Sequence, residues 1–131
     1  MQWDESENAG FSKAKPWLGV NRNYRYINCA SQKDDPDSVL NFYKTLIALR
    51  KNTECLVYGE FIPVFADDRL LIYQRKLNEE KYTVALNFSS HKIKLPKKFA
   101  AIFSGTPVIS TWADINAGGC LNPWEGILFR N

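Results

Sequence analysis

The chain has 131 residues, of which 45% are hydrophobic and 24% are charged, which is typical of a single globular domain. Its formal net charge is +3, too small a surplus to predict binding to nucleic acid or to a membrane surface. No apolar run approaches the length of a membrane span, and the N-terminus lacks the basic and apolar regions of a secretory leader.

The cysteines predict a reducing compartment. Cys29, Cys55 and Cys120 are odd in number and widely separated, and His91 is the single histidine. This usage does not predict a disulfide framework, and it leaves too few ligands for an ordinary zinc site. We therefore expect a cytoplasmic protein with no metal site and no cofactor.

The opening of the chain, to about Asn28, has neither the 3.6-residue nor the 2-residue recurrence of a packed helix or strand. Irregular segments of this length are mostly functional loops or disordered linkers. Linkers are poor in aromatic residues, whereas this segment contains Trp3, Phe11, Trp17, Tyr24 and Tyr26. We therefore expect an ordered loop that lies against another surface.

One helix is predicted next, over Pro36–Lys51. Asp35 is a candidate N-cap, and Pro36 suits the first helical position because its missing N–H costs nothing there. Apolar residues recur at helical spacing and form one stripe, which predicts a helix that packs on a partner surface. The stripe consists of Val39, Leu40, Tyr43, Leu46 and Ile47.

After Cys55 the pattern changes to the two-residue period of strands. Tyr82, Val84, Leu86 and Phe88 alternate with more polar positions, and Leu70–Tyr73 is apolar on both faces. Short strands at this spacing, with no helix between them, predict a mainly β fold, an antiparallel β-sandwich. The remaining predicted strands are Leu56–Phe61, Ile62–Phe65 interrupted by Pro63, Lys92–Leu95, Ala100–Phe103, Val108–Thr111 and Gly126–Arg130.

Several motifs resemble one enzyme family. They are Gln-Trp-Asp from Gln2, Asn-Ala-Gly-Phe-Ser from Asn8, Lys-Pro-Trp-Leu from Lys15 and Ile27-Asn28. They are similar to the segment after the eighth barrel strand in the α-amylase-type retaining α-glucosidases, glycoside hydrolase family 13, nearest the oligo-1,6-glucosidases. Residues 34–51 resemble the eighth barrel helix, and the later strands resemble the C-terminal Greek-key domain of that superfamily.

The resemblance implies that residues 1–52 are the end of a (β/α)8 barrel and that residues 53–131 are the C-terminal sandwich. A barrel of this type needs about 250 residues, so the chain would be the last part of an enzyme that hydrolyses α-1,6 or α-1,4 glucosidic bonds. The three catalytic carboxyl groups of the family lie on earlier strands. We therefore expect no catalytic residue in this chain, and we expect the isolated chain to be inactive.

The opening loop would then lie at the substrate rim of the barrel. Indole rings stack on sugar C–H faces, while carboxylates and amides bond to hydroxyl groups. A purely structural role, pinning the loop to the barrel, is the competing interpretation. The candidate rim residues are Gln2, Trp3, Asp4, Asn8 and Trp17.

Other functions are left open by the sequence. A non-catalytic carbohydrate-binding or structural β-sandwich module would also be rich in aromatic residues. Within the enzyme interpretation, dextran glucosidase, trehalose-6-phosphate hydrolase and sucrose or trehalose isomerase are alternatives. The expected partners are an oligosaccharide substrate and the missing barrel, with self-association through the helix stripe if the barrel is absent.

Overall fold

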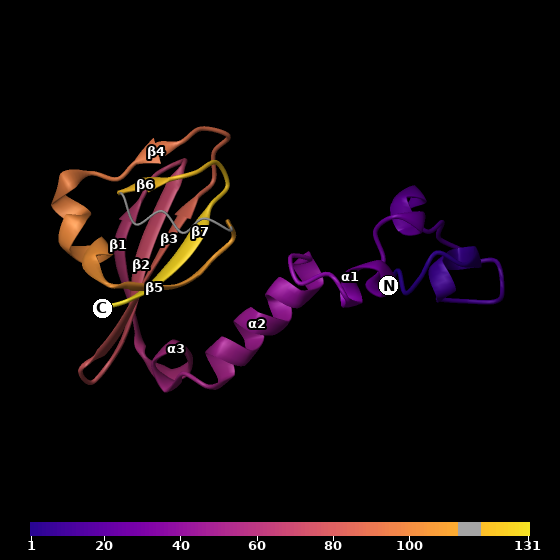
Figure 1. Cartoon of the computed structure of the whole chain (residues 1–131), viewed down its shortest axis with the longest axis horizontal. Coiled ribbons are helices and arrows are strands. Elements are labelled where there is room, and N and C mark those ends of the chain that lie inside the picture. The colour runs from indigo at the N-terminus through magenta and orange to yellow at the C-terminus, as the bar shows by residue number, and fades with distance from the viewer. Residues whose placement is uncertain (113–118) are drawn as a thin grey trace. The chain divides into compact units, whose positions relative to one another are not determined.

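The computed structural model describes residues 1–112 and 119–131. It divides into two compact units, Met1–Leu49 and Arg50–Asn131, which we describe separately (Figure 1). The opening segment to Asn28 has no long helix or strand, as predicted, and contains only the short helical turns η1 (Glu7–Gly10) and η2 (Arg22–Arg25). The short helix α1 (Cys29–Lys33) follows it.

The long helix α2 (Val39–Lys51) starts in the first unit. It begins three residues later than predicted, because Ser38 and not Asp35 caps it. Ser38 Oγ accepts a hydrogen bond from the amide of Asn41 at 3.2 Å, as an N-cap side chain does. Asp35 instead accepts from the amide of Asp37 at 2.9 Å, so Asp35 and Pro36 form a turn that precedes the helix.

The predicted strand at Leu56–Phe61 is wrong in its first half, where the second unit forms the short helix α3 (Glu54–Tyr58). A short apolar run does not distinguish a strand from a buried helical turn by its period. Cys55 is fully buried and Leu56 is 8% exposed. The helix ends at Gly59, where a Cβ would lie 2.4 Å from the carbonyl oxygen of Cys55, so only glycine fits that close approach.

The main sheet is antiparallel, as predicted, with the order β1-β2-β3-β7-β5. The first three strands are consecutive, whereas β7 lies between β3 and β5. The register of β1 against β2 shifts between Pro63 and Phe65, which places the proline on an edge strand next to a bulge, where sheets tolerate it. The strands are β1 (Glu60–Ala66), β2 (Leu70–Leu77), β3 (Glu80–Asn87), β5 (Thr106–Ser110) and β7 (Gly126–Arg130).

A thin second layer covers one face of this sheet. It contains a two-stranded ribbon of β4 (Ile93–Lys94) and β6 (Cys120–Leu121) and the 3-10 helix η3 (Lys97–Ser104), and Figure 1 shows the ribbon alongside the sheet. The predicted strand Ala100–Phe103 is therefore wrong. Phe99 and Phe103 are four positions apart, and that spacing puts two residues on one face of a strand as well as of a helix.

The apolar core lies between the sheet and this second layer. The rings of Phe103 and Phe129 pack edge to face with their centroids 5.3 Å apart. The ring centroids of Phe65 and Phe99 are 5.6 Å apart. Both distances lie within the range of favourable aromatic pairs. The core residues are Leu70, Ile72, Ala85, Leu95, Phe99, Phe103, Leu121, Ile127 and Phe129. All of them belong to the second unit.

A buried polar cluster closes the end of the core where β3 ends and β7 begins. Glu125 is 1% exposed, and its carboxylate accepts hydrogen bonds from Ser110 Oγ at 3.0 Å and from the Asn122 amide at 2.6 Å. The main-chain amide of Asn87 donates to the main-chain carbonyl of Glu125 at 2.8 Å. Buried polar groups are tolerated when they are paired in this way, and the cluster ties three segments together.

We predict that Glu125→Ala destabilises the second unit. The substitution leaves the half-buried Asn122 amide and the Ser110 hydroxyl without their acceptor, which costs about 1–3 kcal/mol. For a unit of this size each kcal/mol lowers the melting temperature by about 4–8 °C. Thermal unfolding followed by circular dichroism measures the shift, with Glu79→Ala as the control because Glu79 is exposed in the β2–β3 turn. Equal melting temperatures for the two variants would contradict the prediction.

Candidate functional site

The opening residues are held by the helix that follows them. The first amides of α1, those of Cys29 and Ala30, donate to the carbonyl oxygens of Gln2 and Trp3, both at 2.9 Å. These helix-start amides have no partner within their own helix. Asn28 and Ser31 complete the N-terminus as a reciprocal capping box. The backbone at positions 2 and 3 is therefore fixed by α1.

A second polar group of contacts joins α1 to the start of α2. The side chain of Gln32 accepts from the Leu40 amide at 3.0 Å, and Ser38 Oγ donates to the Gln32 carbonyl at 2.8 Å. The Asn41 side chain donates to the carbonyls of Gln32, Lys33 and Asp35 at 3.1, 3.1 and 2.7 Å. Hydrogen bonds, rather than buried apolar surface, therefore fix the connection between α1 and the start of α2.

A left-handed turn follows the predicted rim residues. Asn8, Ala9 and Gly10 have φ values of 56°, 58° and 66°, a conformation that L-residues adopt at a cost and seldom in succession. Ala9 is fully buried, and its carbonyl accepts from the Trp3 amide at 2.9 Å. A Cβ on Gly10 would lie 2.7 Å from the Asp4 carboxylate oxygens, so the turn needs glycine at this position.

Asp4 holds the other side of the same turn. One of its carboxylate oxygens accepts from both the hydroxyl group and the amide of Ser6. These bonds, the hydroxyl one first, lower the pKa of Asp4 below its ordinary value of 3.8. A general acid of a glycosidase needs a raised pKa, so the observed environment suits a structural carboxylate.

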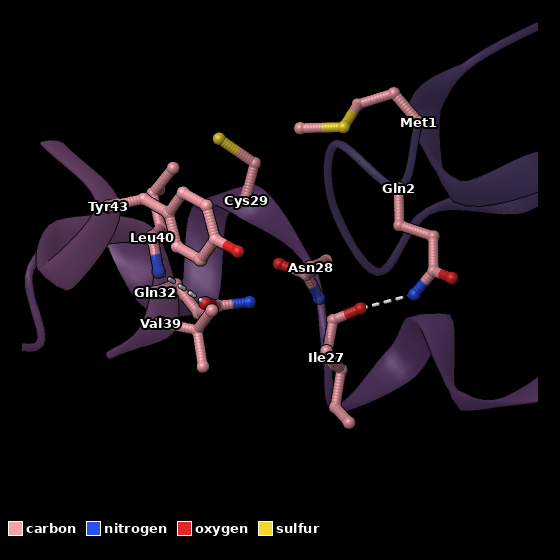
Figure 2. A pocket seen from close by; sticks show the side chains of 9 residues that line it. All are labelled: Met1, Gln2, Ile27, Asn28, Cys29, Gln32, Val39, Leu40 and Tyr43. Carbon is pink, nitrogen blue, oxygen red and sulfur yellow. Dashed lines mark hydrogen bonds between the residues drawn. The ribbon is translucent and has the colours of Figure 1, made fainter. Parts of the chain in front are cut away.

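A shallow open pocket of about 470 Å³ lies within the first unit (Figure 2). Its walls come from the first two residues, from the start of α1 and from the first turns of α2, and they contain no side chain that is charged at neutral pH. Of the lining residues, the sequence analysis predicted a functional role for Gln2 alone. Ile27 and Asn28 form one of the family-like motifs, and that motif was the feature of the sequence that could have pointed to them. The lining residues are Met1, Gln2, Ile27, Asn28, Cys29, Gln32, Val39, Leu40 and Tyr43.

The predicted rim residues fall into two groups. The side-chain amide of Gln2 donates to the Ile27 carbonyl and to Asn23 Oδ1, and that of Asn8 donates to the Ser12 carbonyl at 3.0 Å, so both hold the loop as Asp4 does. Trp3 and Trp17 are 49% and 92% exposed. These indole rings retain free faces for a ligand or for a covering surface.

The described residues hold no cluster of three or more side chains suited to a metal ion. Within the same residues, no helix is long and apolar enough to cross a membrane. All three cysteines are free thiols.

The alpha-amylase catalytic-domain family model matches residues 1–59. The chain is also 47% identical, over 138 aligned residues, to the oligo-1,6-glucosidase of Parageobacillus thermoglucosidasius. That alignment covers 99% of this chain and 24% of the relative. The chain belongs to the alpha-amylase family.

Two further proteins are similar in sequence to nearly the whole of this chain. The glucan 1,6-alpha-glucosidase of Streptococcus dysgalactiae subsp. equisimilis is 36% identical over 134 residues, 99% of this chain and 24% of the relative. Among solved structures, the isomaltulose synthase of Klebsiella sp. LX3 is 34% identical with a TM-score of 0.86, over 98% of this chain and 24% of that one. The chain therefore spans about a quarter of the length of these alpha-amylase-family relatives.

We predict that Gly10→Ala loosens the opening loop and that Gly19→Ala does not. At Gly10 the new methyl group meets the Asp4 carboxylate and φ is 66°, whereas a Cβ on Gly19 has nothing within 4 Å. Left-handed backbone at a residue with a Cβ costs about 1–2 kcal/mol. Hydrogen exchange at the amides of Ala9 and Phe11 measures the effect. Equal exchange in the two variants would show that the contact with Asp4 does not constrain the turn.

Proposed function

We propose that this chain forms the C-terminal part of a retaining α-glucosidase that hydrolyses α-1,6 or α-1,4 bonds in short oligosaccharides. The observation that carries the proposal is the 47% identity to an oligo-1,6-glucosidase over 99% of the chain. In this arrangement residues 1–52 complete the catalytic barrel and residues 53–131 form the C-terminal β domain. The family match that ends at residue 59 supports a boundary in this region.

The catalytic carboxyl groups would come from the preceding part of the enzyme. A retaining glycosidase needs a nucleophile and an acid/base about 5–5.5 Å apart. The pocket of the first unit has no charged side chain in its walls, and the Asp4 carboxylate is bonded to Ser6 with a lowered pKa. These features favour a loop that contacts substrate over one that performs the chemistry.

The opening loop would lie at the C-terminal face of the barrel, where barrel enzymes build their active sites. Gln2, Asp4 and Asn8 would shape the loop through their internal hydrogen bonds. Trp3 and Trp17 would present indole faces, which stack on sugar rings. Their exposed fractions of 49% and 92% support this division of roles.

A sucrose isomerase is the second candidate. Solved structures of isomaltulose and trehalulose synthases match 98% of the chain with TM-scores of 0.86 and 0.85, but their identities of 34% and 33% are lower than that of the oligo-1,6-glucosidase. A non-catalytic sugar-binding module accounts for the β unit alone and does not account for the family match at residues 1–59. A cytoplasmic location is supported by the three free cysteines.

The activity test uses the isolated chain and a chimera. In the chimera, this chain replaces the segment it matches in the oligo-1,6-glucosidase of Parageobacillus thermoglucosidasius. We expect the isolated chain to be inactive and the chimera to hydrolyse isomaltose. Trp3→Ala and Gln2→Ala in the chimera should lower kcat/KM by roughly 5- to 150-fold, the effect of losing one contact worth about 1–3 kcal/mol. Glu5→Ala, at an exposed position of the same loop, is the control.

The outcomes separate the alternatives. Conversion of sucrose into isomeric disaccharides by the chimera, without isomaltose hydrolysis, would favour the isomerase. Hydrolysis by the isolated chain that disappears in Asp4→Ala would place the chemistry within these residues and overturn the proposal. Equal kcat/KM for Trp3→Ala and Glu5→Ala would remove Trp3 from the substrate rim.

We also propose that the isolated chain self-associates through α2. The helix buries none of its residues, and Val39, Tyr43 and Ile47 are 68%, 61% and 51% exposed along one stripe. Burying such a side chain contributes about 1.5–3 kcal/mol. Light scattering should show oligomers that dissociate in Tyr43→Glu/Ile47→Glu and persist in Thr45→Glu, which adds a charge at another exposed position of the helix. A monomer at all concentrations would contradict this expectation.

A further inference from the structure

A tight turn before β7 presents a tryptophan to solvent. The turn runs from Asn122 to Glu125 and is closed by a hydrogen bond from the Glu125 amide to the Asn122 carbonyl at 3.2 Å. Pro123 occupies its second position, and Trp124 occupies its third with a φ of 58°. These are the features of a type II turn, which normally has glycine or asparagine at the third position because φ is positive there.

Tryptophan is an unfavourable residue at this position of the turn. Positive φ costs free energy for a residue with a Cβ, and Trp124 is 64% exposed, so most of its apolar surface stays in water. A glycine would remove both costs. Residues held in such a conformation concentrate at functional sites. The turn geometry therefore does not account for the tryptophan and indicates a function for the indole ring itself.

A second exposed indole lies beside the turn. Trp112 follows β5 in the chain, and its ring N–H donates to the carbonyl of Pro123 at 3.1 Å. That carbonyl belongs to the peptide bond that joins Pro123 to Trp124, so the Trp112 ring contacts the backbone of the turn. Trp112 is 44% exposed. The hydrogen bond satisfies the polar edge of this ring and leaves part of its apolar surface open.

The buried carboxylate of Glu125 connects the two tryptophan-bearing segments. It accepts from the Asn122 amide at 2.6 Å within the turn and from the Ser110 hydroxyl at 3.0 Å on β5. The same Ser110 oxygen accepts from the main-chain amide of Trp112 at 3.1 Å. Because the backbone of both segments is held in this way, a ligand on the indole rings would have little structure left to order, which favours binding.

The chemistry around the two rings suits a sugar. Indole faces stack on the C–H faces of sugar rings, and hydroxyl groups need polar partners beside them. The Trp124 amide donates to the Ser89 carbonyl at 3.1 Å, and the next two residues, Ser90 and His91, are exposed and have donors and acceptors for hydroxyl groups. Two rings are too small for a stable protein interface, which buries about 800 Å² on each partner, whereas each ring is comparable in size to one sugar unit.

We propose that Trp112 and Trp124 form a binding site for a short chain of glucose units. The site lies in the unit Arg50–Asn131, whereas the candidate rim residues lie in Met1–Leu49. A chain of two or more sugar rings offers a separate face to each indole. The choice of glucose rests on the proposed function, because an α-glucosidase meets this class of sugar.

The test measures binding of isomaltotriose to the isolated chain by isothermal titration calorimetry. Trp124→Gly removes the indole and suits the positive φ, so this variant should unfold at the same temperature as the unsubstituted chain or at a higher one. Its Kd should nevertheless rise by about tenfold, the effect of losing one aromatic contact. Trp112→Phe keeps an aromatic ring without the N–H that bonds to Pro123, and it should weaken binding less than Trp112→Ala.

Tyr58→Ala is the matched control. Tyr58 belongs to the same unit and is 76% exposed, so the substitution removes an exposed aromatic ring from another place. Its Kd for isomaltotriose should equal that of the unsubstituted chain. If Trp124→Gly and Tyr58→Ala have the same Kd, or if the unsubstituted chain does not bind isomaltotriose at millimolar concentrations, the proposal is wrong.

Other occupants of the two rings give different results. If Trp124→Gly dissociates an oligomer of the isolated chain and leaves the Kd unchanged, the rings contact a second copy and the proposal is overturned. If it leaves that Kd unchanged but shortens the half-life of the chimera at elevated temperature, another part of the enzyme covers the ring, and the proposal is overturned as well.

The proposed function is tested separately, by isomaltose hydrolysis with the unsubstituted chimera. Calorimetry on the isolated chain requires no catalytic activity. An inactive chimera, together with an isolated chain that binds isomaltotriose through Trp124, would contradict the α-glucosidase and support the sugar site. An active chimera whose isolated segment shows the same Kd with and without the Trp124 indole would do the reverse.

Discussion

The burial of apolar surface beneath one face of the five-stranded sheet is the interaction on which this structure depends. The buried apolar core lies wholly in the unit Arg50–Asn131. Within the described part of Met1–Leu49, Ala9 is the single apolar residue that is buried. Apolar burial is the main favourable contribution to folding. The second unit therefore has an internal source of stability that the first unit lacks.

The first unit is ordered by hydrogen bonds, and these are a weak source of net stability. Each contributes about 0.5–1.5 kcal/mol after exchange with water, whereas ordering the backbone costs about 1–2 kcal/mol per residue. The hydrogen bonds of Gln32, Ser38 and Asn41 fix the connection between α1 and α2, but they bury no apolar core.

The same hydrogen bonds give the opening loop its shape. Asp4, Gln2 and Asn8 have the donors and acceptors that sugar recognition needs, yet in this structure each of them bonds to its own loop. The strained turn at Asn8–Gly10 persists because its neighbours hold it, and such strain is often found at functional sites. The polar residues thereby fix the backbone around Trp3, whose ring is 49% exposed, while the ring of Trp17 in the same segment is 92% exposed.

The pattern of apolar residues along the chain predicted those helices and strands in which these residues recur regularly over a long stretch. The alternation around Val84 predicted β3, the apolar stripe of Tyr43 predicted α2, and the family motifs predicted the identity that the comparisons support. The short elements α3 and η3 were missed, because an apolar run of four or five residues satisfies a strand and a helical turn equally well.

Only the tertiary structure decided how these elements are combined. Nothing in the local sequence places β7 between β3 and β5, since that order depends on pairing between residues far apart in the chain. The burial of Glu125, whose carboxylate accepts a hydrogen bond from Ser110 on β5, is decided in the same way. The sequence by itself determined which residues are apolar and at what period they recur, whereas the partners that cover them are set by long-range packing, which a local period does not encode.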